Sequence, residues 1–170
     1  KWVKTTIDSL ISEVSGLAVN PINGNIYLTN NNDAWYMVQV FTKYGGYKEQ
    51  FSGNGYGTGQ YELRANSDVA SDSSGNIFVL DSLNNKVVKF DSSYVPVWEL
   101  GGSGSGNGKF STPLGLGVDS SGNVYVADTG NNRIQKINGT TGLYDSQFGS
   151  VGSGNGLLSA PNDVTVDGSG

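Results

Sequence analysis

One sequence pattern recurs at nearly constant spacing along the chain. Its anchoring glycines are Gly24, Gly75, Gly122 and Gly170, which lie 51, 47 and 48 residues apart. A fixed period of this size is the signature of a repeat architecture, in which each repeat folds as one supersecondary unit against its neighbours. The period therefore restricts the chain to folds that are assembled from equivalent units of this length.

Each repeat divides into four short predicted strands. In the clearest copy we expect a strand at Leu116–Val118, followed by strands over Val124–Asp128, Arg133–Ile137 and Tyr144–Phe148. Asp, Ser and Gly occupy the first turn, residues 119–122, because these residues supply local hydrogen bonds and permissive dihedral angles. Four strands in a repeat of this length are typical of a β-propeller blade, whereas the repeats of a β-helix or solenoid are shorter.

The composition agrees with an all-β chain. Gly contributes 26 of the 170 residues, and Gly and Asn are both poor helix formers. Hydrophobic residues make up 36% and include nine Tyr, six Phe and three Trp, which is enough to build a packed core. The composition therefore excludes a helical domain, and the apolar content argues against a disordered chain.

At these residues the chain resembles the NHL-repeat family. The resemblance is strongest at Asp119–Ile134, where the sequence reads Asp-Ser-Ser-Gly-Asn-Val-Tyr-Val-Ala-Asp-Thr-Gly-Asn-Asn-Arg-Ile; it is good over Asp72–Val87 and weak over Asn20–Phe41. It implies a β-propeller of four-stranded antiparallel blades, with about three to three and a half blades present, half of a six-bladed ring. The predicted units of this NHL-like segment are approximately 1–50, 51–99 and 100–147, with 148–170 incomplete.

A half ring is expected to expose apolar blade faces at both ends, because only closure leaves short and protected edges. Terminal repeats normally carry a polar cap, and none is visible in the sequence. Three arrangements therefore stay open: the chain is part of a longer one, two copies complete one ring, or copies stack end to end into an open assembly.

A polar group recurs between the second and third predicted strands of each unit. Because it occurs once per unit, we expect it to hold the turn, with Asp accepting hydrogen bonds from backbone donors, rather than to bind a metal or act in catalysis. The members of this structural turn motif are Asp81, Asn84 and Asn85 in one unit and Asp128, Asn131, Asn132 and Arg133 in the next.

The composition closes several catalytic routes. The chain has no His and no Cys, which excludes imidazole and thiolate sites, including the His-dependent chemistry of lyases that resemble this family. The Gly-rich stretch 104–110 is not a phosphate-binding loop, because no Ser or Thr follows Lys109 and no helix is predicted after it. We therefore predict that the chain is not an enzyme and has no catalytic or cofactor-binding residues.

Calcium is the cofactor left open by the resemblance. Lactonase-like propellers hold calcium on acidic and Asn side chains at the central channel, so a calcium-dependent hydrolase completed outside this chain is the first alternative. The acids outside the repeat pattern are Asp33, Glu62, Asp68 and Asp163, and we expect each to be a surface charge. One carboxylate per Asp-Ser-Ser-Gly turn is few for an ion that takes about 6–8 oxygen ligands, so no metal site is predicted.

Departures from the repeat point to function, since repeat-specific insertions map to loops. The first unit carries two extra residues between Tyr27 and Phe41, in a segment that contains Asp33, Trp35 and Tyr36. Exposed aromatic residues on a loop suit partner or sugar binding, so these three residues are the predicted contacts with a protein or glycan. The alternative is that the aromatic rings fold back over the weakest blade.

Asn138-Gly139-Thr140 is the one Asn-x-Ser/Thr sequence of the chain, and it falls in a predicted hairpin turn. In a secreted eukaryotic protein, Asn138 could carry a glycan. The net charge of −5 and the scattered basic residues disfavour nucleic-acid binding, and no apolar run is long enough to span a membrane.

We therefore predict a non-enzymatic propeller module for protein or glycan interaction or structural assembly, extracellular or at the cell surface. Self-association that completes the ring or forms a filament is part of this prediction. The second alternative is an adaptor domain of a larger cytosolic protein.

Overall fold

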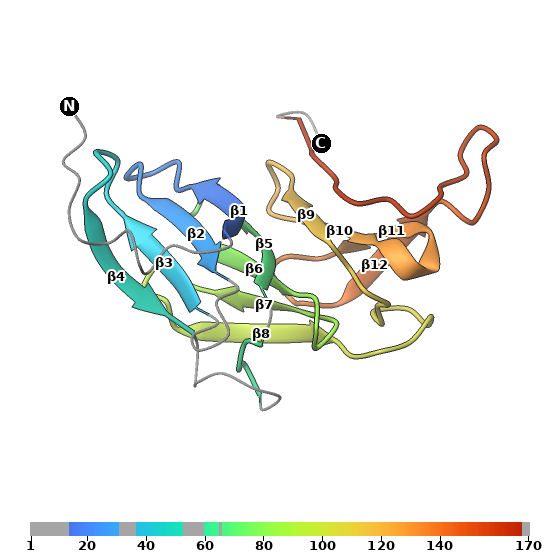
Figure 1. Cartoon of the computed structure of the whole chain (residues 1–170), viewed down its shortest axis with the longest axis horizontal. Helices are drawn as coiled ribbons and strands as arrows, with labels where there is room; N and C mark the ends of the chain where they lie inside the picture. Colours follow the sequence, from blue (N-terminus) through green and yellow to red (C-terminus); the bar gives the residue numbers. More distant parts are fainter. Residues whose placement is uncertain (1–13, 31–36, 53–59, 65, 168–170) are drawn as a thin grey trace.

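The computed structural model describes residues 14–30, 37–52, 60–64 and 66–167. In this part of the chain, three four-stranded antiparallel sheets follow one another, each with its strands in chain order (Figure 1). The bounds are β1 Val14–Val19, β2 Ile26–Asn30, β3 Met37–Phe41, β4 Tyr47–Phe51, β5 Asn66–Ser71, β6 Ile77–Asp81, β7 Lys86–Phe90, β8 Pro96–Gly101, β9 Gly115–Val118, β10 Val124–Asp128, the 3-10 helix η1 Thr129–Asn131, β11 Arg133–Ile137 and β12 Tyr144–Phe148.

The predicted all-β fold of four-stranded blades is confirmed, and the ring of blades is not closed. The innermost strands β1, β5 and β9 lie next to one another in that order, as the successive blades of a propeller require. The segment 162–166 follows β9, and a Cβ atom at Gly117 would lie 2.8 Å from the carbonyl oxygen of Val164. Residues 162–166 form no strand, because no described residue forms a β-ladder with them.

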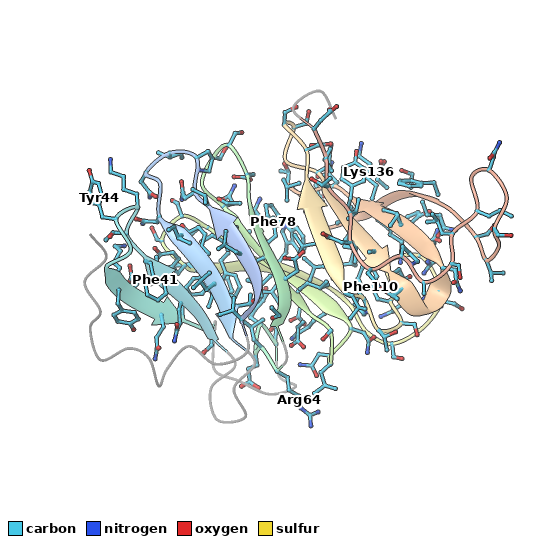
Figure 2. The ribbon with its side chains drawn as sticks, turned by 45° about the horizontal axis from the view of Figure 1, so that its top comes forward. Phe41, Tyr44, Arg64, Phe78, Phe110 and Lys136 are labelled. Carbon is cyan, nitrogen blue, oxygen red and sulfur yellow. The ribbon has the colours of Figure 1, made fainter. Side chains whose placement is uncertain are left out.

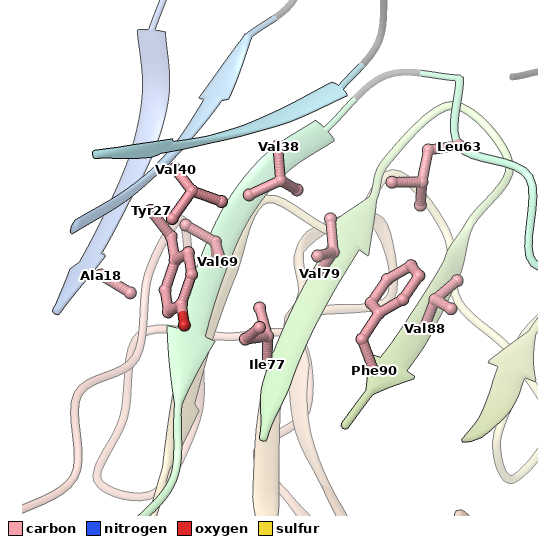
Figure 3. Packing of buried hydrophobic residues seen from close by; sticks show 10 residues of the cluster. All are labelled: Ala18, Tyr27, Val38, Val40, Leu63, Val69, Ile77, Val79, Val88 and Phe90. Carbon is pink, nitrogen blue, oxygen red and sulfur yellow. The ribbon is translucent and has the colours of Figure 1, made fainter. Parts of the chain in front are cut away.

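The first core cluster lies between the first and second sheets (Figure 3). Tyr27 and Val40 of the first sheet pack against Ile77, Val79 and Phe90 of the second, and all five side chains are buried. Successive residues of a strand point to opposite faces, so β6 places Ile77 and Val79 on this side only. Burial of such side chains is worth about 1.5–3 kcal/mol each, which makes the blade interface the main source of stability.

The second core cluster lies between the second and third sheets. Phe78 and Leu80 of β6 face it, together with Trp98 of β8, and they pack against Val126 and Ile137 of the third sheet. Since β6 contributes to both clusters, all five of its residues are buried. The continuous apolar sequence of the second strand in each unit is explained by this two-sided burial.

Two opposite ends of the blades differ in the chain segments that they carry. We call one end the turn face and the other the loop face; Tyr44 projects from the first and Arg64 from the second (Figure 2). The turn face consists of residues 20–25, 42–46, 72–76, 91–95, 119–123 and 138–143. The described part of the loop face consists of residues 60–64, 82–85, 102–114, 129–132 and 149–161.

Candidate functional site

The Asp of the repeated motif is buried in a dense set of hydrogen bonds. Asp128 accepts a hydrogen bond from the backbone N–H of Ser111 at 2.7 Å and from the side chains of Asn131 and Gln135 at 2.9 and 3.0 Å. The guanidinium Nε of Arg133 donates to the same carboxylate at 2.7 Å. Asp128 is therefore a paired buried charge that fixes the loop entering its blade.

The preceding blade repeats this arrangement. Asp81 accepts hydrogen bonds from the backbone N–H of Arg64 at 2.8 Å and from the side chain of Asn84, also at 2.8 Å. Arg64 belongs to the segment that enters the second blade, as Ser111 belongs to the segment that enters the third. The motif Asp thus has the same structural partner, an incoming loop, in both blades.

The second Asn of the motif holds the loop that leaves the blade. Asn85 and Asn132 have φ angles of 53° and 56°, the left-handed region that Asn tolerates. The side-chain oxygen of Asn85 accepts the backbone N–H of Thr112 at 2.7 Å, and that of Asn132 accepts the backbone N–H of Ala160 at 2.9 Å. The motif therefore joins each blade to the next, a role that spans more than a single turn.

A groove follows the innermost strands from blade to blade. This axial groove, of about 330 Å³, is lined by β1, β5, β9 and residues 163–166. Asp68 and Asp163 both line it, together with apolar residues such as Leu116 and Val118. The structure thus brings together two of the acids that lie outside the repeat pattern.

Asp68, which we expected to be a surface charge, is half-buried in the wall of the axial groove. Its carboxylate accepts the backbone N–H of Val69 and, from the next blade, the backbone N–H of Leu116, each at 2.8 Å. Burial raises the pKa of Asp68 to about 6; the two backbone hydrogen bonds oppose this rise, and the nearby charge of Asp163 adds to it.

The position of these two acids has a sequence signal that we did not use. At the start of the innermost strand, successive units carry Gly16, Asp68, Gly115 and Asp163. A Cβ atom at Gly16 would lie 2.8 Å from Oδ1 of Asp68, and one at Gly115 would lie 2.5 Å from Oδ1 of Asp163. The alternation of Gly with Asp therefore makes room for each carboxylate beside the preceding blade.

The predicted partner contacts Asp33, Trp35 and Tyr36 lie outside the described residues. The chain leaves β2 at Asn30 and enters β3 at Met37, and both of these ends are at the loop face. Glu62 lies in the segment before β5, at the same end. The described residues Asn30, Met37 and Glu62 therefore lie at the same end of the blades.

Asn138 lies on the opposite side, in the hairpin between β11 and β12 on the turn face. It is exposed, and its side-chain oxygen accepts the backbone N–H groups of Thr140 and Thr141 at 3.0 and 2.9 Å. The carbonyl oxygen of Gly139 accepts hydrogen bonds from Lys89 and the indole of Trp98, so this hairpin is docked on the second blade.

Metal ligands do not gather in the described part of the chain. No group of three or more Asp or Glu residues, the ligand types that this sequence offers, is close enough there to hold an ion. The Oδ1 atom of Asp119 accepts hydrogen bonds from the backbone N–H groups of Ser121 and Asn123 in the first turn of the third blade. No helix of the described residues is long and apolar enough to cross a membrane.

Comparison with known families decides the classification. A model described as 6-bladed beta-propeller matches residues 3–101, more than half of the chain. The chain belongs to the 6-bladed β-propeller family. A model of the NHL repeat also matches residues 110–137 of this propeller, which confirms the resemblance that the repeat sequence indicated.

Solved structures agree with the propeller fold. A protein of unknown function from Bacteroides thetaiotaomicron shares 19% identity at a TM-score of 0.65, over 91% of this chain and 42% of its own. A catalytically inactive virginiamycin B lyase from Staphylococcus aureus shares 15% identity at 0.64, over 88% and 44%. A chain of a nidogen/laminin complex shares 21% identity at 0.65, over 91% and 52%.

The propeller segment spans about half the length of these solved structures. At such identities the likeness shows the fold alone, since one propeller scaffold hosts unrelated activities. No curated protein sequence matches the chain.

Proposed function

We propose that this propeller segment is a non-catalytic interaction module, extracellular or at the cell surface, that binds a protein or glycan through its loop face. The observation that carries the proposal is that the polar residues form two groups with different positions. The repeated motif residues join the blades, whereas residues that depart from the repeat are free for binding. Asp33, Trp35 and Tyr36 belong to the sequence between Asn30 and Met37, whose described ends are at the loop face, and Asp68 and Asp163 line the axial groove. Loops on a rigid scaffold are where binding residues concentrate.

Three further observations support this proposal. The chain offers neither imidazole nor thiol for catalysis. One similar structure is a complex of two proteins, nidogen and laminin, which agrees with a role in protein interaction. Asn138 lies on the turn face, so a glycan there would leave the loop face open.

The experiment compares loop-face and turn-face variants for binding. A fluorescent form of the chain is applied to a glycan array and to cultured cells, and bound fluorescence is recorded. We expect Trp35→Ala with Tyr36→Ala to lower binding at least about tenfold, the usual size of an aromatic hot spot. Tyr44→Ala is the matched control, because Tyr44 is an exposed aromatic residue of the turn face. Equal loss in the control, or no loss in the double variant, would contradict the proposal.

Self-association is a second candidate, favoured by the exposed apolar residues of β1. Leu17 and Val19 are 60% and 53% exposed, although they lie on an innermost strand. Native mass spectrometry tests this: self-association predicts multiples of 17.8 kDa that Leu17→Ser disperses. A single mass of one chain at all concentrations would rule it out.

A further inference from the structure

Among the described residues, neither carboxylate of the axial groove forms an ion pair with a basic side chain. Ion pairs such as Lys86 to Glu99 and Arg133 to Asp128 lie elsewhere in the blades and include neither Asp68 nor Asp163. The pKa of Asp68 is raised chiefly by burial and further by the nearby charge of Asp163. No basic side chain in the described part of the chain therefore neutralises the negative charge of these two acids.

Both carboxylates are held in place by the backbone and retain acceptor capacity. Asp68 accepts one hydrogen bond from its own strand and one from Leu116 of the next blade, and Asp163 accepts one from Val164 at 2.7 Å. An ionised carboxylate offers about four acceptor positions, so each acid can accept further donors. Pre-positioned acceptors of this kind bind a cation without first having to be ordered.

We propose that the axial groove binds a basic side chain, the ammonium of Lys or the guanidinium of Arg, presented by a protein partner and held by Asp68 and Asp163. The proposal rests on the proposed function and narrows the partner to a protein with a protruding basic residue. The half-buried residues Val118 and Val166 line the groove and offer apolar contact to the aliphatic stem of such a side chain, while its charged end meets the acids.

The same geometry suits a basic side chain better than a calcium ion. Calcium takes about 6–8 oxygen ligands, whereas this groove supplies two carboxylates that already accept backbone hydrogen bonds. A neutral glycan would leave both negative charges uncompensated. A guanidinium or ammonium donates several hydrogen bonds and also neutralises charge.

The test uses the 15N-labelled 170-residue chain at pH 7.5 and two small probes. N-acetyl-arginine methylamide is titrated against its neutral analogue, N-acetyl-citrulline methylamide, and backbone amide shifts are followed by NMR. We expect arginine to shift the amides of Leu116, Val69 and Val164, which bond the two acids, and citrulline to leave them in place. Asp68→Asn and Asp163→Asn should each weaken arginine binding about tenfold, because a charged hydrogen-bond partner is lost.

Asp145→Asn is the matched control, since Asp145 is an exposed acid on the outer strand β12. If Asp68→Asn changes amide shifts throughout the protein, the test relies on arginine binding by Asp163→Asn, because Asp163 is exposed. Equal shifts with citrulline, shifts elsewhere only, or unchanged binding in both Asn variants would overturn the proposal. Calcium chloride that shifts the same amides and displaces arginine would replace it with a metal site. Should arginine fail to bind while Trp35→Ala with Tyr36→Ala still abolishes cell binding, only this inference falls.

Discussion

Among single residues, Asp128 shows how much of the stability depends on one repeated carboxylate. It is fully buried and receives hydrogen bonds from Arg133, Gln135, Asn131 and the incoming loop. An Asp128→Ala variant would leave the guanidinium of Arg133 buried without its partner. We expect the free energy of unfolding to fall by about 3–5 kcal/mol, as for other buried pairs broken on one side.

Urea denaturation followed by circular dichroism measures this loss. Asp145→Ala, which removes an exposed carboxylate of β12, is the control and should change the free energy of unfolding by no more than about 0.5 kcal/mol. Comparable effects in the two variants would mean that the buried motif does not hold the blades together.

Asp68 makes stability depend on pH in a defined direction. Its pKa is raised from 3.8 to about 6 in the folded chain, so the folded state binds this proton more tightly than the unfolded state. The associated stabilisation is fully present below about pH 3.8 and is lost as the pH rises through about 6. Two pKa units correspond to about 3 kcal/mol, and partial exposure reduces this to about 1–2 kcal/mol.

The Asp68→Asn variant isolates this contribution, because Asn keeps an acceptor for Leu116 but never ionises. As the pH rises from 4 to 7.5, the free energy of unfolding of Asp68→Asn should increase by about 1–2 kcal/mol relative to that of wild type. Chemical denaturation of both proteins at the two pH values gives this difference. If the difference in free energy of unfolding between wild type and Asp68→Asn is the same at both pH values, the raised pKa of Asp68 is contradicted.

At the scale of elements, the hairpin between β11 and β12 joins the third blade to the second. Its Gly139 lies so close to the carbonyl oxygen of Gly122 that a Cβ atom would collide with it. Gly139→Ala would therefore move the hairpin away from Trp98 and Lys89, and we expect a loss of about 2–4 kcal/mol. Gly154→Ala, with ordinary contacts and no left-handed φ, should be nearly neutral in the same thermal and urea unfolding experiments. A neutral Gly139→Ala would show that the hairpin adjusts freely.

The sequence predicts elements well where the signal is local. The ranges expected for β10, β11 and β12 agree with the structure, because Gly and Asn at the turns and apolar runs between them act over a few residues. Contacts between blades were not predictable in the same way. Trp98 bonds to Gly139 across 41 residues, and Asp68 bonds to Leu116 across 48. Such partners are set by how sheets pack, and no local pattern of a single unit encodes that packing.

The residues of the candidate site show the same difference between local sequence signals and contacts between blades. The Asp and Asn of the repeated motif were identified from recurrence, although their partners in neighbouring loops were not. The pairing of Asp68 with Asp163 was missed, because each was assessed alone as a surface charge. The alternation of Gly and Asp at one repeat position becomes informative only once the innermost strands are known to lie side by side.

For the whole molecule, we propose that partner binding uses the loop face and leaves the turn face free. The chain has no Cys, so a single introduced thiol can carry a bulky polyethylene glycol at one chosen place. Leu83 on the loop face and Leu143 on the turn face are both exposed, at 53% and 65%. Leu83→Cys and Leu143→Cys therefore form a matched pair of attachment sites.

The most direct test is the binding of these two conjugates to cultured cells, measured by flow cytometry against the unmodified chain. The account predicts that the polymer at position 83 blocks binding and that the polymer at position 143 leaves it unchanged. Binding that is lost with the polymer at position 143 and kept with it at position 83 would contradict the assignment of function to the loop face.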